Sequence, residues 1–298
     1  MGKLKHTPPF ALLFALVIAF AQSPPIHLRL TAVFSNLPEN GSSINALLSI
    51  DPTDLKWSSQ KALIHIAGAA YDKNGVALAP VDSTFTLQWN TQDYDEAVKG
   101  GIVFGFHVAI AKPGAYTVRA TVSDPATGRT GSADQHVEVP DVESGRLALS
   151  GIVLQEATYA ALYTLVPFTA ANADLPQVPA PRPDATGGAA RRSFRRGTLL
   201  AYGFKIINAK NDAGQLPELE VETSMFHDGE QVLTGKTMLD PVGAQGAPDP
   251  QRLMTGGRLV LGRDMKPGEY VLRVVVTDKL AKSEFGVATQ SMDFEIEP

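Results

Sequence analysis

The sequence predicts an all-β protein made of two tandem immunoglobulin-like β-sandwich domains that follow a signal peptide. Three observations lead to this prediction: apolar and polar residues alternate over many short segments, turn dipeptides separate the segments, and one turn-and-strand motif occurs twice. Alternation with a period of two buries one face of a strand, and about seven such strands with regular turns are typical of this sandwich. We place the first domain at residues 26–140 and the second at residues 146–298.

The first domain is predicted from seven alternating segments. In one of them, Phe85, Leu87 and Trp89 alternate with polar residues, so these three side chains are expected to point inward. One helical segment is expected at residues 91–99, with Thr91 as its N-cap. The predicted strands lie near residues 26–34, 44–50, 62–71, 84–90, 104–110, 116–123 and 132–139.

A motif in the first half recurs in the second half at an offset of 154 residues. In each copy a Pro-Gly turn precedes a tyrosine that enters a strand, where its hydroxyl can bond back to the corner. So many matches at one offset indicate an internal duplication, and a double glycine precedes each copy. The matches are Lys112-Pro113-Gly114-Ala115-Tyr116, Arg119, Val122 and Asp124 with Lys266-Pro267-Gly268-Glu269-Tyr270, Arg273, Val276 and Asp278, preceded by Gly100-Gly101 and Gly256-Gly257.

The second domain is predicted to hold seven less regular strands. A hairpin turn is expected at Asp228-Gly229. Residues 157–166 fit a short helix or a strand, and residues 167–197, rich in proline, alanine and glycine, are expected to form a flexible loop. The predicted strands lie near residues 147–154, 199–208, 218–226, 231–235, 258–262, 270–277 and 289–296.

One strand of the duplicated motif differs in its outward positions. The second half has Val271 and Val275 where the first half has Thr117 and Thr121. Apolar side chains are not favoured in water, so we expect this outer face to be covered by the other domain, the long loop or a partner.

The first 21 residues have the organisation of a secretory signal peptide. A positively charged start precedes an apolar run at residues 10–20, and Ala19-Phe20-Ala21 fits a small-residue cleavage site. The run is shorter than the ~20 residues that cross a bilayer, so a cleaved signal is favoured over an uncleaved anchor. We therefore expect a periplasmic or secreted protein with no membrane span after cleavage.

The composition and the spacing of reactive residues argue against several kinds of catalytic, metal-binding and nucleic-acid-binding sites. The chain has no cysteine, which excludes disulfides, thiol catalysis and thiolate metal sites. Its net charge of −5 argues against nucleic acid as a partner, because phosphate binding needs a concentrated basic face. The six histidines lack the spacing of metal-ligand motifs, and no G-x-S-x-G nucleophile motif occurs. We therefore expect no enzyme activity, no cofactor and no metal site.

The predicted loop contains the strongest concentration of charge in the sequence. Its four cations are a candidate surface for an anionic glycan, a lipid or an acidic partner. The alternative is a solvated linker that binds nothing. The four residues are Arg191, Arg192, Arg195 and Arg196.

Several segments along the chain share a pattern with a known family. They are residues 141–154, the Lys-Pro-Gly-Ala-Tyr strand before them, residues 268–270 and 276–281, residues 26–34 and residues 194–197. Together they resemble the C-terminal region of the acidobacterial VWFA-related (von Willebrand factor A related) proteins over nearly all of the mature chain. Members of that family typically carry an A domain with a D-x-S-x-S metal site, which this sequence does not show, so metal-dependent adhesion does not carry over. The resemblance implies an exported accessory region of unknown activity.

These observations favour a non-catalytic extracytoplasmic protein-interaction or scaffolding protein, whose partner is another envelope or extracellular protein. Function on a sandwich usually lies on loops and strand edges. Two alternatives remain open. A glycan-binding or adhesion module would present a row of exposed aromatic side chains. A hydrolase would need carboxylates that converge only in the folded chain and have perturbed pKa values.

Overall fold

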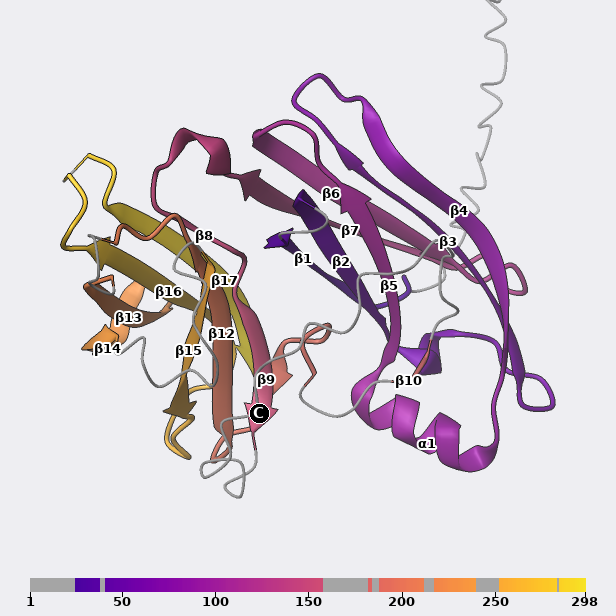
Figure 1. Cartoon of the computed structure of the whole chain (residues 1–298). Helices are drawn as coiled ribbons and strands as arrows, with labels where there is room; N and C mark the ends of the chain where they lie inside the picture. Colours follow the sequence, from indigo (N-terminus) through magenta and orange to yellow (C-terminus); the bar gives the residue numbers. More distant parts are fainter. Residues whose placement is uncertain are drawn as a thin grey trace, which may run out of the picture.

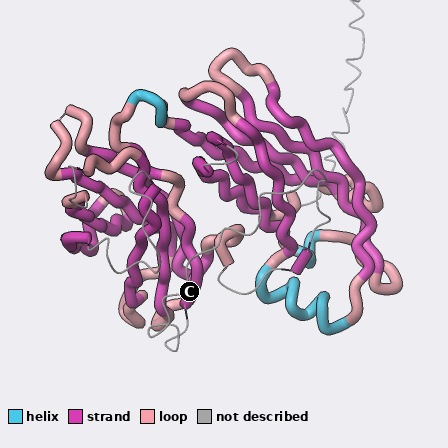
Figure 2. The backbone as a smooth tube through the Cα atoms, viewed as in Figure 1, coloured by secondary structure: helices cyan, strands magenta, loops and turns pink. Residues whose placement is uncertain are grey.

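The computed structural model describes residues 25–37, 41–157, 182–183, 188–211, 217–239, 252–282 and 284–298. This part of the chain is mostly β, with several antiparallel sheets and one α-helix (Figures 1 and 2). The predicted signal peptide at residues 1–21, residues 158–166 and much of the predicted loop lie outside the described residues.

The first half forms two antiparallel sheets, and each of its seven predicted strands is present. One sheet has the order β4-β3-β6-β7, and the other has the order β1-β2-β5 and is extended by β10. The strands are β1 (Leu28–Leu37), β2 (Gly41–Ile50), β3 (Lys61–Tyr71), β4 (Ala77–Gln88), β5 (Ile102–Ala109), β6 (Gly114–Ser123), β7 (Thr130–Val139) and β10 (Arg182–Pro183).

The predicted helix is confirmed as α1 (Thr91–Gly100), but its N-cap is Asn90 rather than Thr91. The Asn90 side-chain oxygen accepts a hydrogen bond from the Asp93 N–H at 2.9 Å. Both residue types cap helices well, so the sequence does not distinguish them. Trp89, predicted to point inward, is half-buried and packs on Trp57 with ring centroids 5.3 Å apart.

The second half repeats the strand order of the first. β14-β13-β16-β17 corresponds to β4-β3-β6-β7, and β15-β12 with β8 and β9 corresponds to β5-β2-β1. The Asp228-Gly229 hairpin is confirmed between β13 and β14. The strands are β8 (Ala148–Leu149), β9 (Val153–Ala157), β12 (Leu199–Ile207), β13 (Leu219–His227), β14 (Glu230–Leu239), β15 (Arg252–Val260), β16 (Gly268–Asp278) and β17 (Val287–Ile296).

Two strand predictions in the second half are corrected. Residues 147–154 form two short strands instead of one, because the chain at Gly151 turns toward β1 and donates a backbone hydrogen bond to Phe34 O at 2.8 Å. β15 begins at Arg252 instead of residue 258. Glycines interrupt its apolar alternation, and at Gly257 a Cβ would lie 2.6 Å from the Tyr202 ring of β12.

The two double glycines are not equivalent, which corrects that part of the predicted repeat. Gly101 lies just beyond the end of α1 and has a φ of 97°, a value that glycine adopts readily. Gly256 and Gly257 lie inside β15 instead. The duplication therefore rests on the Pro-Gly motif and the strand order.

The predicted flexible loop at residues 167–197 contains regular structure in its described part. β10 pairs antiparallel with β5 of the first half, and β11 (Ser193–Phe194) pairs parallel with β17 of the second half. One insertion therefore adds a strand to a sheet of each half. Composition cannot reveal this, because each strand is two residues long and is held by distant partners.

The duplicated motif makes the same hydrogen bond in both halves, as predicted. The Tyr116 hydroxyl donates to Lys112 O at 2.7 Å, and the Tyr270 hydroxyl donates to Lys266 O at 2.8 Å. Burial raises the pKa of both phenols, so both hydroxyls stay protonated and able to donate.

Replacing Tyr116 or Tyr270 with phenylalanine is expected to lower the free energy of unfolding by about 1 kcal/mol in each case. The ring keeps its buried contacts, so only the hydrogen bond to the corner is lost. Urea denaturation of both variants measures this cost. A loss in one variant only would show that the two corners are not equivalent.

The buried apolar side chains form two clusters. The first includes Phe34 and Phe104 from the two strands β1 and β5, and the second includes Phe194 and Phe294 from β11 and β17. The clusters meet where β1 passes the second half: Val33 packs against the second cluster. In Figure 1 the sheets of the first half (indigo to magenta) lie beside those of the second (orange to yellow).

Candidate functional site

The structure divides the four predicted arginines between different environments. Arg192 is buried, with 3% of its surface exposed, whereas Arg195 and Arg196 are exposed and Arg191 is half-buried. The predicted four-residue anionic-partner surface is therefore corrected, because Arg192 does not lie on the surface.

Arg192 connects the two halves. Its guanidinium donates to Asp293 Oδ1 at 2.5 Å and to Asp293 O at 2.9 Å on β17, and to Leu30 O at 2.9 Å on β1. Its backbone has a φ of 50°, in the left-handed region that a non-glycine residue rarely adopts. Burial lowers the pKa of Arg192, and the nearby Asp293 carboxylate opposes this effect.

A second arginine contacts the same carboxylate from the first half. Arg29 on β1 lies 2.9 Å from Asp293 and 3.0 Å from Glu269 through its Nη2 atom. Its Nη1 atom lies 3.6 Å from Glu295. Burial alone would raise the pKa of Asp293, but Arg192 and Arg29 outweigh it and hold the pKa below its usual value. The junction therefore carries an ionised carboxylate between two cations.

Further hydrogen bonds extend this junction. Thr31 Oγ1 donates to Ala190 O at 3.0 Å. Arg252 Nε on β15 donates to Asn36 Oδ1 on β1 at 3.0 Å. Strand β1 therefore contacts the insertion and a sheet of the second half along much of its length.

Arg191 also contacts both halves of the chain. It donates to Lys99 O at the end of α1 at 2.6 Å and lies 3.3 Å from the Glu297 carboxylate. Arg191 and Arg192 thus make close contacts within the chain, and Arg195 makes a long ion pair with Glu156 at 3.9 Å.

A cleft of about 420 Å³ opens at this junction. Side chains of both charges line it, which would suit a ligand with both positive and negative groups. The charged and titratable lining residues are His27, Arg29, Asp51, Arg191, Glu269 and Glu295. Across the described ranges, no group of three or more His, Asp or Glu side chains is placed to hold a metal ion.

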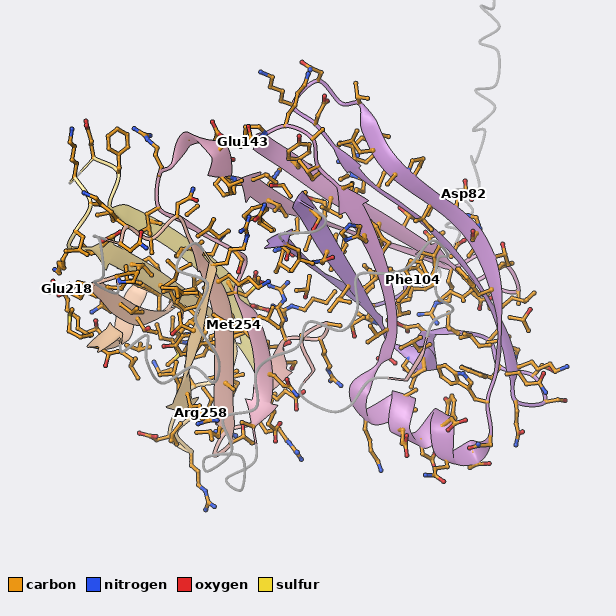
Figure 3. All side chains as sticks on the ribbon, viewed as in Figure 1. Asp82, Phe104, Glu143, Glu218, Met254 and Arg258 are labelled. Carbon is orange, nitrogen blue, oxygen red and sulfur yellow. The ribbon has the colours of Figure 1, made fainter. Side chains whose placement is uncertain are left out.

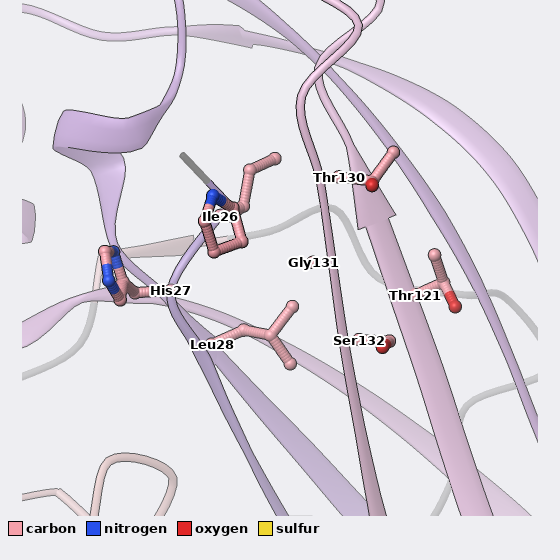
Figure 4. Close-up of a pocket in the computed structure, with 8 residues that line it drawn as sticks. Ile26, His27, Leu28, Thr121, Thr130, Gly131 and Ser132 are labelled. Carbon is pink, nitrogen blue, oxygen red and sulfur yellow. The ribbon is translucent and has the colours of Figure 1, made fainter. Parts of the chain in front are cut away.

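A second hollow, of about 550 Å³, is also lined by His27 (Figure 4). His27 Nδ1 lies 2.8 Å from Asp54 Oδ2, and Arg129 Nη2 donates to Asp54 Oδ1 at 2.7 Å. Burial raises the pKa of Asp54, but hydrogen bonds from His27 and Arg129 outweigh it and lower the pKa.

This His–Asp pair resembles half of a nucleophilic triad, in which the acid orients the base. In Figure 4, however, Leu28 lies between the His27 ring and the hydroxyls of Ser132 and Thr121. Asp54 also accepts the backbone N–H of His27 at 2.6 Å. The arrangement therefore fits an anchor that positions the start of β1 better than it fits a catalytic pair.

The outer face of β16, which the sequence predicts to be covered, is partly shielded from solvent in the described structure. Val271 is 38% exposed and Val275 is half-buried, so neither side chain is fully exposed. Val271 pairs with Asp293, whose carboxylate binds Arg29 of the first half. The first half therefore reaches one end of this face, and cover over the remainder stays a prediction.

Sequence reasoning missed Arg29 and Asp293, which organise the junction. Each occupies an outward position of an alternating strand, where a charged residue is ordinary. No local signal distinguishes them, because their partners lie far away in the sequence: Arg29 and Asp293 are 264 positions apart.

No protein-family model matches the chain, and no curated protein matches it in sequence. Among the helices of the described segments, none is long and apolar enough to cross a membrane. We therefore infer the function from the contacts and surfaces of this chain.

Proposed function

We propose that the chain is a non-catalytic extracytoplasmic protein-interaction or scaffolding protein, built from two tandem immunoglobulin-like β-sandwich domains. The repeated strand order and the two tyrosine corners support the domain assignment. The signal-peptide pattern supports export, with another envelope or extracellular protein as the partner. An accessory role like that of the C-terminal region of VWFA-related proteins is part of this proposal.

The distribution of exposed apolar side chains carries the proposal. Of the ten large apolar side chains exposed in the described residues, seven lie in the second half. Four of the seven are on β14 and β15, the outermost strands of their sheets, where another chain can reach them. Apolar groups concentrated on one part of a surface mark protein-interaction sites. The seven are Val232, Met238, Met254, Val260, Val271, Phe285 and Val287.

The aromatic residues give less support to a glycan-binding module. A sugar would stack on a flat, exposed aromatic row. Trp57 and Trp89 instead pack on each other with their planes tilted by 36°, and both rings border the first apolar cluster.

The carboxylates give less support to a hydrolase. A general acid needs a raised pKa near neutrality. Despite burial, the pKa of Asp54 is lowered by hydrogen bonds from His27 and Arg129, and the pKa of Asp293 is lowered by Arg192 and Arg29. Both groups are suited to ion pairing and poorly suited to donating a proton.

Site-specific photo-crosslinking in the native host tests the proposed function. A photoreactive phenylalanine analogue replaces Val260, Val287 or, as a control in the first half, Val76. The three side chains are 58%, 54% and 55% exposed, so chance collisions should label them equally. We expect a discrete adduct mass at Val260 or Val287 and none at Val76. Equal labelling at all three positions would contradict the proposal.

A further inference from the structure

Strand β15 has a free edge within the described part of the chain. It is the last strand in its sheet and pairs only with β12. An edge strand presents unpaired N–H and C=O groups that can receive another strand. The sequence pattern predicts a strand only from residue 258, so it gives no indication of this edge.

The corresponding edge in the first half already receives a strand. β5 holds the place in its sheet that β15 holds in the second half, and β10 pairs antiparallel with β5. β10 comes from a distant insertion and contacts the Ile102 end of β5. This fold therefore uses the same edge to bind an extended segment in its other copy.

The side chains along β15 are apolar and basic. Met254 and Val260 are 42% and 58% exposed, and alternation along the strand places Arg258 on the same face between them. Figure 3 labels Met254 and Arg258. No residue of β15 is acidic. An added strand would therefore meet apolar contacts at two positions and positive charge at a third.

More arginines gather at the C-terminal end of β15. Gly197, directly after Arg195 and Arg196, donates its N–H to Leu261 O at 2.6 Å. A Cβ at Gly197 would lie 3.2 Å from the side chain of Arg263. The exposed pair from the predicted anionic-partner surface, Arg195 and Arg196, therefore lies near Arg263. The arginines at this end are Arg195, Arg196 and Arg263, and the nearby carboxylates among the described residues are Glu156, 3.9 Å from Arg195, and Asp264.

We propose that the free edge of β15 binds an extended acidic segment of a partner protein. The segment pairs antiparallel with β15 and places apolar side chains against Met254 and Val260. Its carboxylates lie against Arg258 and Arg263. Strand addition of this kind takes affinity from the backbone and specificity from alternate side chains. The inference rests on the proposed interaction function and names the chemistry of its partner.

Fluorescence anisotropy with the mature chain, residues 22–298, tests the charge requirement. The probe is a fluorescein-labelled nine-residue peptide matched to β15. It carries valine at the positions that pair with Met254 and Val260, glutamate at the position that pairs with Arg258 and at the end next to Arg263, and threonine elsewhere. We expect it to bind at least about tenfold more tightly than the same peptide with lysine in place of glutamate. Equal affinity for the two peptides would overturn the proposal.

Backbone N-methylation tests strand addition directly. One version of the acidic peptide is methylated at odd positions and another at even positions. Only every second N–H of an edge strand faces its neighbour, so one version should lose at least about tenfold in affinity and the other should not. If both bind like the parent, the contact is made by charge alone and strand addition is wrong.

Protein variants locate the contact. Arg258→Glu and Arg263→Glu should each weaken binding of the acidic peptide by about tenfold and improve binding of the lysine peptide. Lys73→Glu makes the same charge change on an exposed turn of the first half and should have no effect. Unchanged affinity in the arginine variants would overturn the proposed site.

Two further outcomes separate this inference from the proposed function. If sedimentation shows a dimer of the unliganded protein that Val260→Glu dissociates, a second copy occupies the edge and the foreign partner is wrong. If Val287 forms a discrete photo-adduct while no peptide binds, the interaction function stands and only the β15 site fails.

Discussion

Replacing Arg192 with alanine is expected to lower the free energy of unfolding by about 3 kcal/mol. The variant removes the buried guanidinium that binds the carbonyl oxygen of Leu30 and the carboxylate of Asp293, whose side chain is 49% exposed. We expect the lower end of the usual cost, because Arg29 still contacts Asp293 at 2.9 Å. Urea denaturation at neutral pH measures the change.

Arg195→Ala is the matched control for this variant. Its side chain is 60% exposed, and its ion pair with Glu156 is long, at 3.9 Å. We expect a change within about 0.5 kcal/mol. Amide hydrogen exchange adds a second readout, because Arg192→Ala should deprotect the β1 backbone around Thr31 and Arg195→Ala should not. Equal costs for the two variants would show that the Arg192 contacts do not hold the junction.

The sequence predicted the first half well because its strands bury one face. Every second residue of β6 is buried from Tyr116 to Val122, which is the pattern that alternation detects. In the second half the pattern fails at particular residues. Gly256 and Gly257 have no side chain to alternate, and β8 ends where Gly151 meets β1. A local sequence pattern cannot predict where a strand begins or ends when residues far away in the sequence set those limits.

The junction was harder to predict than the strands. Composition suggests a solvated loop around Arg192, yet its partners Leu30 and Asp293 lie 162 and 101 positions away. Nothing local indicates which arginine of the cluster is buried. The exposed members, Arg195 and Arg196, do behave as the sequence suggests, but their basic neighbour Arg263 is brought close only by the pairing of β12 with β15.

The internal duplication extends further than the sequence motif indicated. Asp124 and Asp278 are buried, at 0% and 3% exposure. Asp124 accepts the backbone N–H of Lys56 at 2.9 Å, and Asp278 accepts that of Lys210 at 2.6 Å. The two lysines are also 154 positions apart. The sequence hardly indicates that Lys56 and Lys210 correspond. Each donates through its backbone N–H, so any residue type except proline could make the same hydrogen bond.

Asp124→Ala and Asp278→Ala are each expected to lower the free energy of unfolding by about 3 kcal/mol, because each leaves buried N–H groups without an acceptor. The carboxylates also accept the N–H groups two residues onward, at 2.8 Å for Asp124 and 2.9 Å for Asp278. Urea denaturation measures the cost, and hydrogen exchange should show the N–H of residue 56 or 210 losing protection in the matching variant only. Lys56→Ala and Lys210→Ala keep the backbone donor, so they should cost less than about 0.5 kcal/mol. If the lysine variants cost as much as the aspartate variants, the side chains hold these loops, and the shared backbone bond is not what the two halves have in common.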